Sequence, residues 1–383
     1  MLEIDTLEGL ATWLSSSPEP EPAAVQALDL RRHEEVLLRS RLPGSLFLGC
    51  TLTPHEAAHL AGVGAVVLPN MPELSFEVHR SHLYPPEVLF EGFDPEDPEG
   101  YAKTLDARIY HEYLAQGGAT PDSIRVSLAR RLHDHSISDA LEEQIEGRKV
   151  VAIMGGHGME RRDPFYARVA RLSRTLTRLG YLMISGGGPG AMEATHLGAF
   201  LAPRVDEDLD AALEILSPRP PDALPGQEYH DRDWLHRAWR VLERFPIPEG
   251  RHSGAESVGI PTWLYGHEPP TPFATQIAKY FANAIREDGL LAIARHGVIF
   301  APGSAGTTQE IFQDAAQNHY ATTGFISPMI LFGSRYWTET RPVWPLLHTV
   351  AQGRRFADLL TLTDDEAEIL HRIETYDPEE YRK

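Results

Sequence analysis

The chain has 383 residues and a formal net charge of −20, from 35 basic and 55 acidic side chains. At about 150 residues per domain, this length predicts one large domain with an appendage, or two domains. The acidic balance disfavours a nucleic acid or an anionic membrane surface as a partner. A single cysteine, Cys50, excludes an internal disulfide. Together with the absence of a signal-like N-terminus and of a membrane-spanning apolar run, this favours a cytoplasmic protein.

Residues 1–147 are expected to form an N-terminal α/β accessory domain. Two short apolar runs, 45–50 and 64–69, flank a helical stretch near residues 54–61, a pattern typical of a β-α-β unit. A longer helix is expected over residues 120–145. Because this region precedes a larger α/β region that begins at residue 148, our hypothesis is that it serves regulation or oligomerisation.

From residue 148 the pattern changes to buried strand, glycine turn and helix. Strand-like runs at 149–154 and 181–185 each end in glycines. A helix is expected after each turn, over residues 164–179 and from Ala191 onward. This alternation predicts the α/β class, with a Rossmann-like doubly wound parallel sheet.

The same domain is expected to span residues 148–360, with a polar, proline-rich insertion at about 203–252 and a helical tail over 361–383. Three further strands are expected, at 257–265, 297–301 and 329–332. Between the first two of these, the proline-rich segment 269–272 is expected to open a helix. Ile277, Phe281 and Ile285 would share one face of that helix, and Asp288–Gly289 would interrupt it.

Three glycine-rich turns leave the carboxyl ends of the expected parallel strands, the edge at which open α/β sheets bind ligands. Backbone N–H groups in such turns, with a helix N-terminus behind them, favour an anionic ligand. The turns are Gly155–Gly158, Gly186–Gly190 and Pro302–Thr307.

Two other kinds of nucleotide site are disfavoured. Gly186, Gly188 and Ala191 satisfy the dinucleotide pattern G-x-G-x-x-A, but this turn follows the second strand of its unit and not the first. Asp206 has the spacing of a ribose-binding acid but falls within the insertion. The P-loop pattern G-x-x-x-x-G-K-[ST] does not occur.

The third turn supports two interpretations. Thr307 and Glu310 fit a capping box, in which they would satisfy the N-terminal amides of the next helix. Alternatively, the turn is a phosphate cradle, and Glu310 places a carboxylate one helical turn inside the same cleft.

The second and third turns resemble the signatures of the Lonely Guy (LOG) family. Residues 186–194 resemble its G-G-G-x-x-G-x-M segment, and residues 302–310 resemble its P-G-G-x-G-T-x-x-E segment. The Gly155 turn, with Asp163, Pro164 and Tyr166 after it, looks like the loop that follows the first strand in that family. The segment 268–272 looks like a feature of its long bacterial members, the nucleotide 5′-monophosphate nucleosidases. The resemblance covers about residues 148–335.

This resemblance implies a homodimer that cleaves the N-glycosidic bond of a nucleoside 5′-monophosphate to free base and ribose 5-phosphate, without metal or cofactor. It implies Glu310 as the carboxylate that stabilises positive charge on the ribose, and Arg286 as a second catalytic residue. Arg295 and Lys279 are alternatives to Arg286, which could also be a solvated helix residue. Substrate and phosphate contacts are expected from Gly155, His157, Gly187, Gly188, Gly190, Met192, Gly303, Ser304, Gly306 and Thr307.

Two departures from the family pattern bear on catalysis. Ser304 stands where the family has glycine, and the spacing around Arg286 differs from the usual one. Both keep a second hypothesis open: a non-catalytic nucleotide-binding or carrier protein that uses the same cleft.

Overall fold

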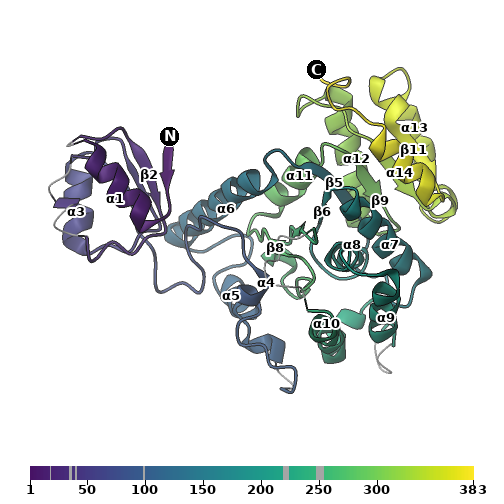
Figure 1. Ribbon diagram of the computed structural model, residues 1–383, viewed down its shortest axis with the longest axis horizontal. Helices are drawn as coiled ribbons and strands as arrows, with labels where there is room; N and C mark the ends of the chain where they lie inside the picture. The colour runs from purple at the N-terminus through teal and green to yellow at the C-terminus, as the bar shows by residue number, and fades with distance from the viewer. Residues whose placement is uncertain (18, 34–36, 39–40, 98–99, 219–223, 247–253) are drawn as a thin grey trace. The chain divides into compact units, whose positions relative to one another are not determined.

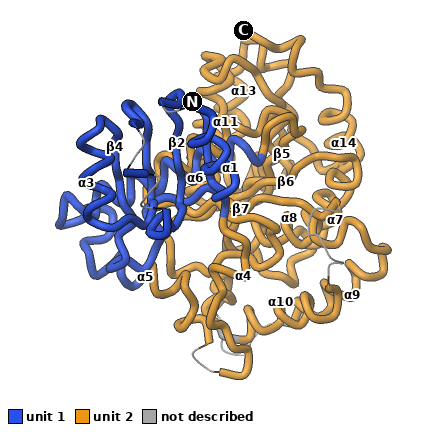
Figure 2. The backbone as a smooth tube through the Cα atoms, turned by 60° about the vertical axis from the view of Figure 1, so that its left-hand side comes forward, with its two compact units in different colours: residues 1–83, 111–144 blue, residues 84–110, 145–383 orange. Residues whose placement is uncertain are grey.

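A computed structural model describes the whole chain except residues 18, 34–36, 39–40, 98–99, 219–223 and 247–253. Contacts divide the chain into two compact units, coloured separately in Figure 2. Unit 1 contains residues 1–83 and 111–144, and unit 2 contains residues 84–110 and 145–383. The predicted boundary at 147 lies close to the last of these crossings. The division differs from the prediction in two places, because residues 84–110 and the predicted tail 361–383 both belong to unit 2.

Unit 1 is built on a four-stranded parallel sheet with the order β1-β2-β3-β4. Its strands are β1 (Leu2–Ile4), β2 (Ala23–Gln26), β3 (Leu46–Leu48) and β4 (Val66–Leu68), and its helices include α1 (Leu7–Ser16), α3 (Pro54–Gly62) and most of α6 (Ile124–Ile145). The predicted β-α-β unit is confirmed as β3-α3-β4. Thr53 and Glu56 form a capping box that fixes the start of α3. Cys50 is buried, and burial raises the pKa of its thiol to about 11.

Unit 2 contains a seven-stranded, fully parallel sheet with the order β11-β10-β9-β5-β6-β7-β8. The strands are β5 (Lys149–Met154), β6 (Tyr181–Ser185), β7 (Ser257–Gly259), β8 (Gln276–Ile277), β9 (Val298–Phe300), β10 (Met329–Phe332) and β11 (Leu360–Thr363). The predicted α/β class and parallel sheet are therefore confirmed. The predicted runs for β5, β6 and β10 match residue for residue, because strands buried on both faces read as continuous apolar runs.

Helices cover both faces of this sheet (Figure 1). One face shares a hydrophobic core with α7 (Pro164–Arg178), α8 (Ala191–Phe200) and α14 (Glu366–Glu374), and with the insertion helices α9 (Asp206–Leu216) and α10 (Arg232–Arg244). On the other side, α11 (Asn283–Ile293) packs on α12 (Ala305–Tyr320), which in turn contacts α13 (Trp344–Ala351). The shorter helices are α4 (Pro86–Leu89), α5 (Leu105–Ala115), η1 (Gly100–Lys103), η2 (Glu228–His230), η3 (Trp263–Tyr265), η4 (Tyr336–Thr340) and η5 (Arg355–Leu359).

The strand order creates a switch point between β5 and β9. From β5 the chain builds outward through β6, β7 and β8, and then returns to place β9 against the opposite edge of β5. In open α/β sheets ligands bind in the crevice beyond the carboxyl ends of the strands at such a point. The first and third glycine turns directly follow β5 and β9, so the topology brings them to this crevice.

The prediction for residues 257–293 is wrong in three respects. The strand at 257 ends at Gly259, and Trp263–Tyr265 form the 3-10 helix η3. The segment opened by the prolines is not a helix, because its backbone pairs with β7 as strand β8. The helix α11 begins only at Asn283 and continues through Asp288, whose carboxylate accepts hydrogen bonds from glutamines of α12.

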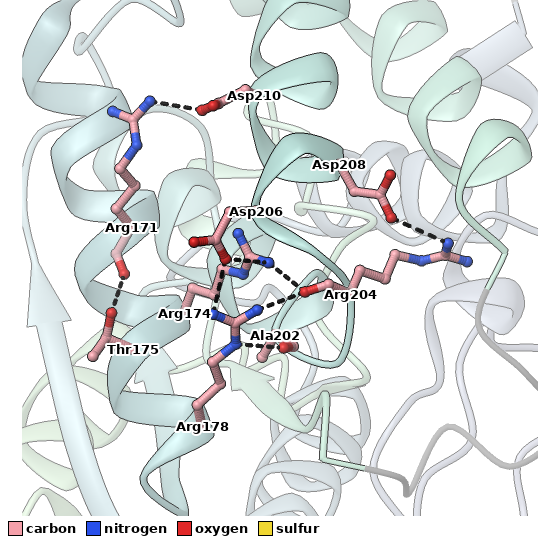
Figure 3. A network of polar contacts seen from close by, with 9 residues as sticks. All are labelled: Arg171, Arg174, Thr175, Arg178, Ala202, Arg204, Asp206, Asp208 and Asp210. Atoms are coloured by element: carbon pink, nitrogen blue, oxygen red, sulfur yellow. Dashed lines mark hydrogen bonds and ion pairs between the residues drawn. The ribbon is translucent and has the colours of Figure 1, made fainter.

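Asp206 lies at the start of α9, on the surface of the insertion. Its carboxylate pairs with Arg174 at 3.1 Å and Arg178 at 3.0 Å, both from α7 (Figure 3). An acid in the first turn of a helix is stabilised by the helix dipole as well as by these partners. Asp206 therefore has a structural explanation as the link between the insertion and α7.

In the described part of the chain, no helix combines the length and the apolar character needed to cross a membrane.

Candidate functional site

A cavity of about 480 Å³ opens beyond the carboxyl ends of β5, β6 and β9. All three glycine turns contribute to its wall, together with the segment after β7 and the first turns of α11 and α12. The lining residues are Gly155, Gly156, His157, Gly186, Gly188, Met192, Pro261, Thr262, Tyr265, His267, Glu268, Arg286, Glu287, Ser304, Ala305, Gly306, Thr307, Gln309 and Glu310. No group of three or more metal-ligating side chains occurs among the described residues.

The structure brings most of the predicted site residues together in this cavity. Those that line it are Gly155, His157, Gly188, Met192, Arg286, Ser304, Gly306, Thr307 and Glu310. Gly187, Gly190 and Gly303 are not part of the lining. They lie behind it, where the turns pack on neighbouring backbone or side chains: a Cβ on Gly187 would lie 2.9 Å from the Ile260 nitrogen.

The third turn leads directly into α12, with Ser304 as the N-cap. The capping-box interpretation is wrong, because Thr307 is already inside the helix and no side chain caps it. Among the described hydrogen bonds between backbone groups, none uses the amides of Ala305, Gly306 or Thr307. These amides form the positive end of the α12 helix dipole, which favours an anion. The Tyr336 hydroxyl donates to the Gly303 carbonyl at 2.6 Å and holds the turn from the far side.

A buried histidine fixes the second turn. His196 of α8 lies between two hydroxyls, with Nε2 2.8 Å from Ser185 Oγ and Nδ1 2.9 Å from Ser257 Oγ. Burial lowers its pKa to about 3, so the ring is neutral. The amide of Gly187 donates to Ser185 Oγ at 3.1 Å. This chain of hydrogen bonds ties the turn to both β6 and β7.

Gly190 joins the first and second turns, and we expect its replacement by alanine to be costly. Its φ is +70°, and a Cβ would lie 2.7 Å from the His157 carbonyl oxygen and closer still to that of Gly156. Gly190→Ala is expected to lower the free energy of unfolding by at least about 3 kcal/mol. The matched control is Gly180→Ala, with φ +88° and nothing within 4 Å of the new Cβ, where about 1 kcal/mol is expected. Equal losses in chemical denaturation of the two variants would contradict this account.

Arg286 and Glu310 face each other across the cavity floor. Both are largely buried, at 7% and 8% exposure, and Arg286 Nη1 lies 4.0 Å from Glu310 Oε1. The guanidinium also donates to the Ile260 carbonyl at 2.6 Å, which fixes its plane. The reading of Arg286 as a solvated helix residue is therefore wrong. Lys279 and Arg295 are not part of the lining.

The carboxyl group of Glu310 has a raised pKa. Burial raises the pKa of its carboxyl to about 7, with Glu287 adding to the rise and Arg286 opposing it. Near neutral pH the group therefore exists in both protonation states. A titratable group held in this state in a cleft is typical of functional sites.

A buried ion pair supports the wall formed by residues 261–268. Lys279 Nζ lies 2.7 Å from Asp106 Oδ1, and both side chains are fully buried. Trp263 Nε1 donates to the same carboxylate at 3.0 Å, and the Tyr101 hydroxyl donates to its other oxygen at 2.7 Å. Because Asp106 has three donors, the segment 84–110 anchors this wall of the cavity.

A second buried pair links the first turn to α8. Arg161 Nε donates to Glu193 Oε2 at 2.8 Å, and Nη2 bonds the other carboxylate oxygen. The Tyr166 hydroxyl donates to Glu193 at 2.8 Å, and Arg161 also reaches the Trp234 carbonyl at 2.6 Å. Glu193 lies in the first turn of α8 and is the anionic half of this buried pair, and Arg161 links it to the insertion through Trp234.

Several lining residues were not predicted as site residues. His267, Glu268 and Glu287 belong to this group; Glu268 opens the segment 268–272, whose resemblance was the signal that could have identified it. The side chain of Tyr265 also lines the cavity. Two aromatic residues that follow it in the chain, Phe273 and Tyr280, are core residues at 1% and 3% exposure.

No family model and no curated protein matches the sequence. Solved structures similar to the chain include a molybdenum cofactor binding protein from the phototrophic bacterium Rippkaea orientalis, with 12% identity, a TM-score of 0.35, and 60% of this chain and 96% of that one covered. The molybdenum cofactor carrier protein from Chlamydomonas reinhardtii gives 13% identity and a TM-score of 0.36, over 59% of this chain and 96% of that one.

Proposed function

We propose that unit 2 is a phosphoribohydrolase that cleaves the N-glycosidic bond of nucleoside 5′-monophosphates. The observation that carries this proposal is the placement of Glu310 beside Arg286, one helical turn from the unpaired amides at the start of α12. The amides and the Thr307 hydroxyl suit a phosphate, and the carboxylate suits the positive charge that develops on C1′ as the bond breaks. Phosphate binding remote from the reacting bond would hold the ribose against Glu310.

A second candidate is a non-catalytic carrier of a phosphorylated small molecule. For this chain, the observation that favours it lies in the site itself. Glu310 is partly neutral near pH 7, and the Arg286 guanidinium already donates to a backbone carbonyl, so both groups have a stable resting arrangement without any reaction.

A panel of nucleotides separates the two candidates. The full chain is incubated with purine and pyrimidine 5′-monophosphates and with the matching nucleosides, and free base is measured by chromatography. If unit 2 is a phosphoribohydrolase, free base is expected from at least one monophosphate. The rate of release from the matching nucleoside is expected to be at least 10²-fold lower, because the phosphate contributes to positioning. Binding in a thermal-shift assay with no base released from any nucleotide would instead support the carrier.

A further inference from the structure

The cavity holds a second titratable pair, separate from Arg286 and Glu310. His157 Nδ1 lies 3.2 Å from Glu268 Oε1. The histidine comes from the first glycine turn, and the glutamate from the segment that follows η3. The Glu268 side chain is 13% exposed, and the His157 side chain is 45% exposed and lines the cavity. One member is therefore held in the wall, while the other is open to a ligand.

The second glycine turn separates the two pairs. The Arg286 guanidinium contacts the turn at Gly186, where Nη2 is 3.5 Å from the carbonyl oxygen. Glu268 Oε2 contacts it at Gly188, 3.3 Å from the position of a Cβ. Two residues of extended chain span at most about 7 Å. The two pairs therefore lie against the same short turn and line one cavity.

Cleavage of the glycosidic bond develops charge in two places. The ribose gains positive charge, and the base departs with the electron pair of the broken bond. Glu310 stabilises the charge on the ribose only. Protonation neutralises the charge on the departing base, and a positioned general acid contributes about 10²–10⁴-fold to the rate.

We propose that His157 is the general acid that protonates the departing base, and that Glu268 is the positioning residue that orients its ring. This inference rests on the proposed phosphoribohydrolase function. The Nδ1–H donates to the Glu268 carboxylate, which fixes the orientation of the ring. The Nε2 side of the ring is then available to the base, because the described contacts of the His157 ring are the Glu268 carboxylate at Nδ1 and an edge contact with the Tyr229 ring.

The protons and electrons balance without any co-reactant other than water. The C1′–N bond breaks, and its electron pair moves to the base nitrogen while Nε2–H of His157 protonates the base. Water adds its oxygen to C1′ and gives a proton to the Glu310 carboxylate. Glu310 then releases that proton to solvent, and His157 takes one up.

A purely structural role explains the pair poorly. An ion pair with one member nearly half exposed contributes only about 0–1 kcal/mol to stability. The first turn is already held by the Ala191 amide, which donates to the Gly156 carbonyl at 3.2 Å, and by the buried pair of Arg161 and Glu193.

The test uses a base that needs no proton. GMP and 7-methylguanosine 5′-monophosphate differ in one methyl group, but the methylated purine already carries the positive charge that general-acid catalysis would supply. In the full chain, His157→Gln and Glu268→Gln are expected to lower kcat on GMP by about 10²–10³-fold with KM changed less than about 3-fold. On the methylated nucleotide the same variants are expected to lose less than about 5-fold. His348→Gln, on α13 and outside the cavity, is the control and should match the wild type on both substrates.

The outcomes distinguish failure of the proposed role of His157 and Glu268 from failure of the proposed function. Equal losses on both nucleotides mean that the pair positions the substrate and does not donate a proton, which overturns the proposal while leaving the proposed function standing. Unchanged kcat on GMP overturns it in the same way. If the wild type releases base from neither nucleotide nor from any other monophosphate, the proposed function itself fails, and this inference fails with it. Circular dichroism of each variant confirms that its fold is kept.

Discussion

Glu310→Gln is expected to lower the rate of base release by about 10²–10³-fold, because the neutral amide lacks the negative charge that stabilises the developing cation on the ribose. The wild-type rate should also depend on pH. Because the carboxylate is the active form and the pKa of Glu310 is about 7, the limb of the kcat/KM profile that depends on Glu310 is expected to rise through pH 7 and to be complete about one pH unit above it. A pH–rate profile measured on the first nucleotide found to react checks both expectations.

The same variant is expected to be more stable than the wild type at high pH. The folded pKa of about 7 lies above the ordinary value of 4.5, so the folded state binds the Glu310 proton more tightly than the unfolded state does. The stability that this group contributes is therefore present below pH 4.5 and is lost as the pH rises through 7. Above pH 8, Glu310→Gln should exceed the wild type by roughly 3 kcal/mol in urea denaturation, and at pH 4 the two should agree. A glutamine variant that is less stable at pH 8 would contradict this account of Glu310.

Removal of one partner of the buried Arg161–Glu193 pair is expected to cause the largest loss of stability. Both side chains are almost fully buried, at 1% and 0% exposure. Without Arg161, the Glu193 carboxylate would stay buried without a counter-charge, with the Tyr166 hydroxyl as its remaining donor among the described hydrogen bonds. Breaking a buried pair from one side costs about 3–5 kcal/mol. Arg161→Met should therefore lower the midpoint of thermal unfolding by roughly 10 °C.

The helix α7 and the insertion provide a matched control for that experiment. Arg171 and Asp210 form an ion pair of 2.8 Å in the same region, but their side chains are 57% and 59% exposed (Figure 3). Exposed pairs of this kind contribute about 0–1 kcal/mol. Arg171→Met is thus expected to shift the midpoint by no more than about 3 °C. If Arg161→Met shifts it equally little, the buried pair does not hold the insertion in place.

The central strands could be predicted from the sequence because their signal is local. The runs at 149–154 and 181–185 are apolar throughout and end in glycine, which leaves few alternatives to a strand buried on both faces. The segment 269–282 gave the opposite result. Ile277 and Phe281 have helical spacing, but Ile277 is buried in the edge strand β8 and Phe281 packs on Trp263, 4.4 Å between ring centroids. Tertiary pairing with β7 decided the conformation there, and no local pattern carries that information.

The candidate site divides in the same way. The glycines and Glu310 form compact motifs, so their gathering at one sheet edge could be predicted from strand order alone. His157 and Glu268 lie 111 positions apart in the chain, and their contact depends on how a turn and a loop meet. Arg161 resembles a surface arginine in sequence, since nothing local shows that Glu193 lies buried against it. Long-range partners of charged residues were therefore the part that sequence reasoning could not supply.

The anchoring of residues 261–268 through Asp106 also limits how this protein can be divided. Unit 2 takes residues 84–110 from before its main segment, so no single cleavage of the chain releases it whole. A fragment that starts at Lys149 retains Lys279 but lacks Asp106, and leaves an ammonium buried without its counter-charge. Such a burial costs several kcal/mol. The two units are thus not exchangeable modules: a fragment or gene fusion designed to keep the seven-stranded sheet intact must also include residues 84–110.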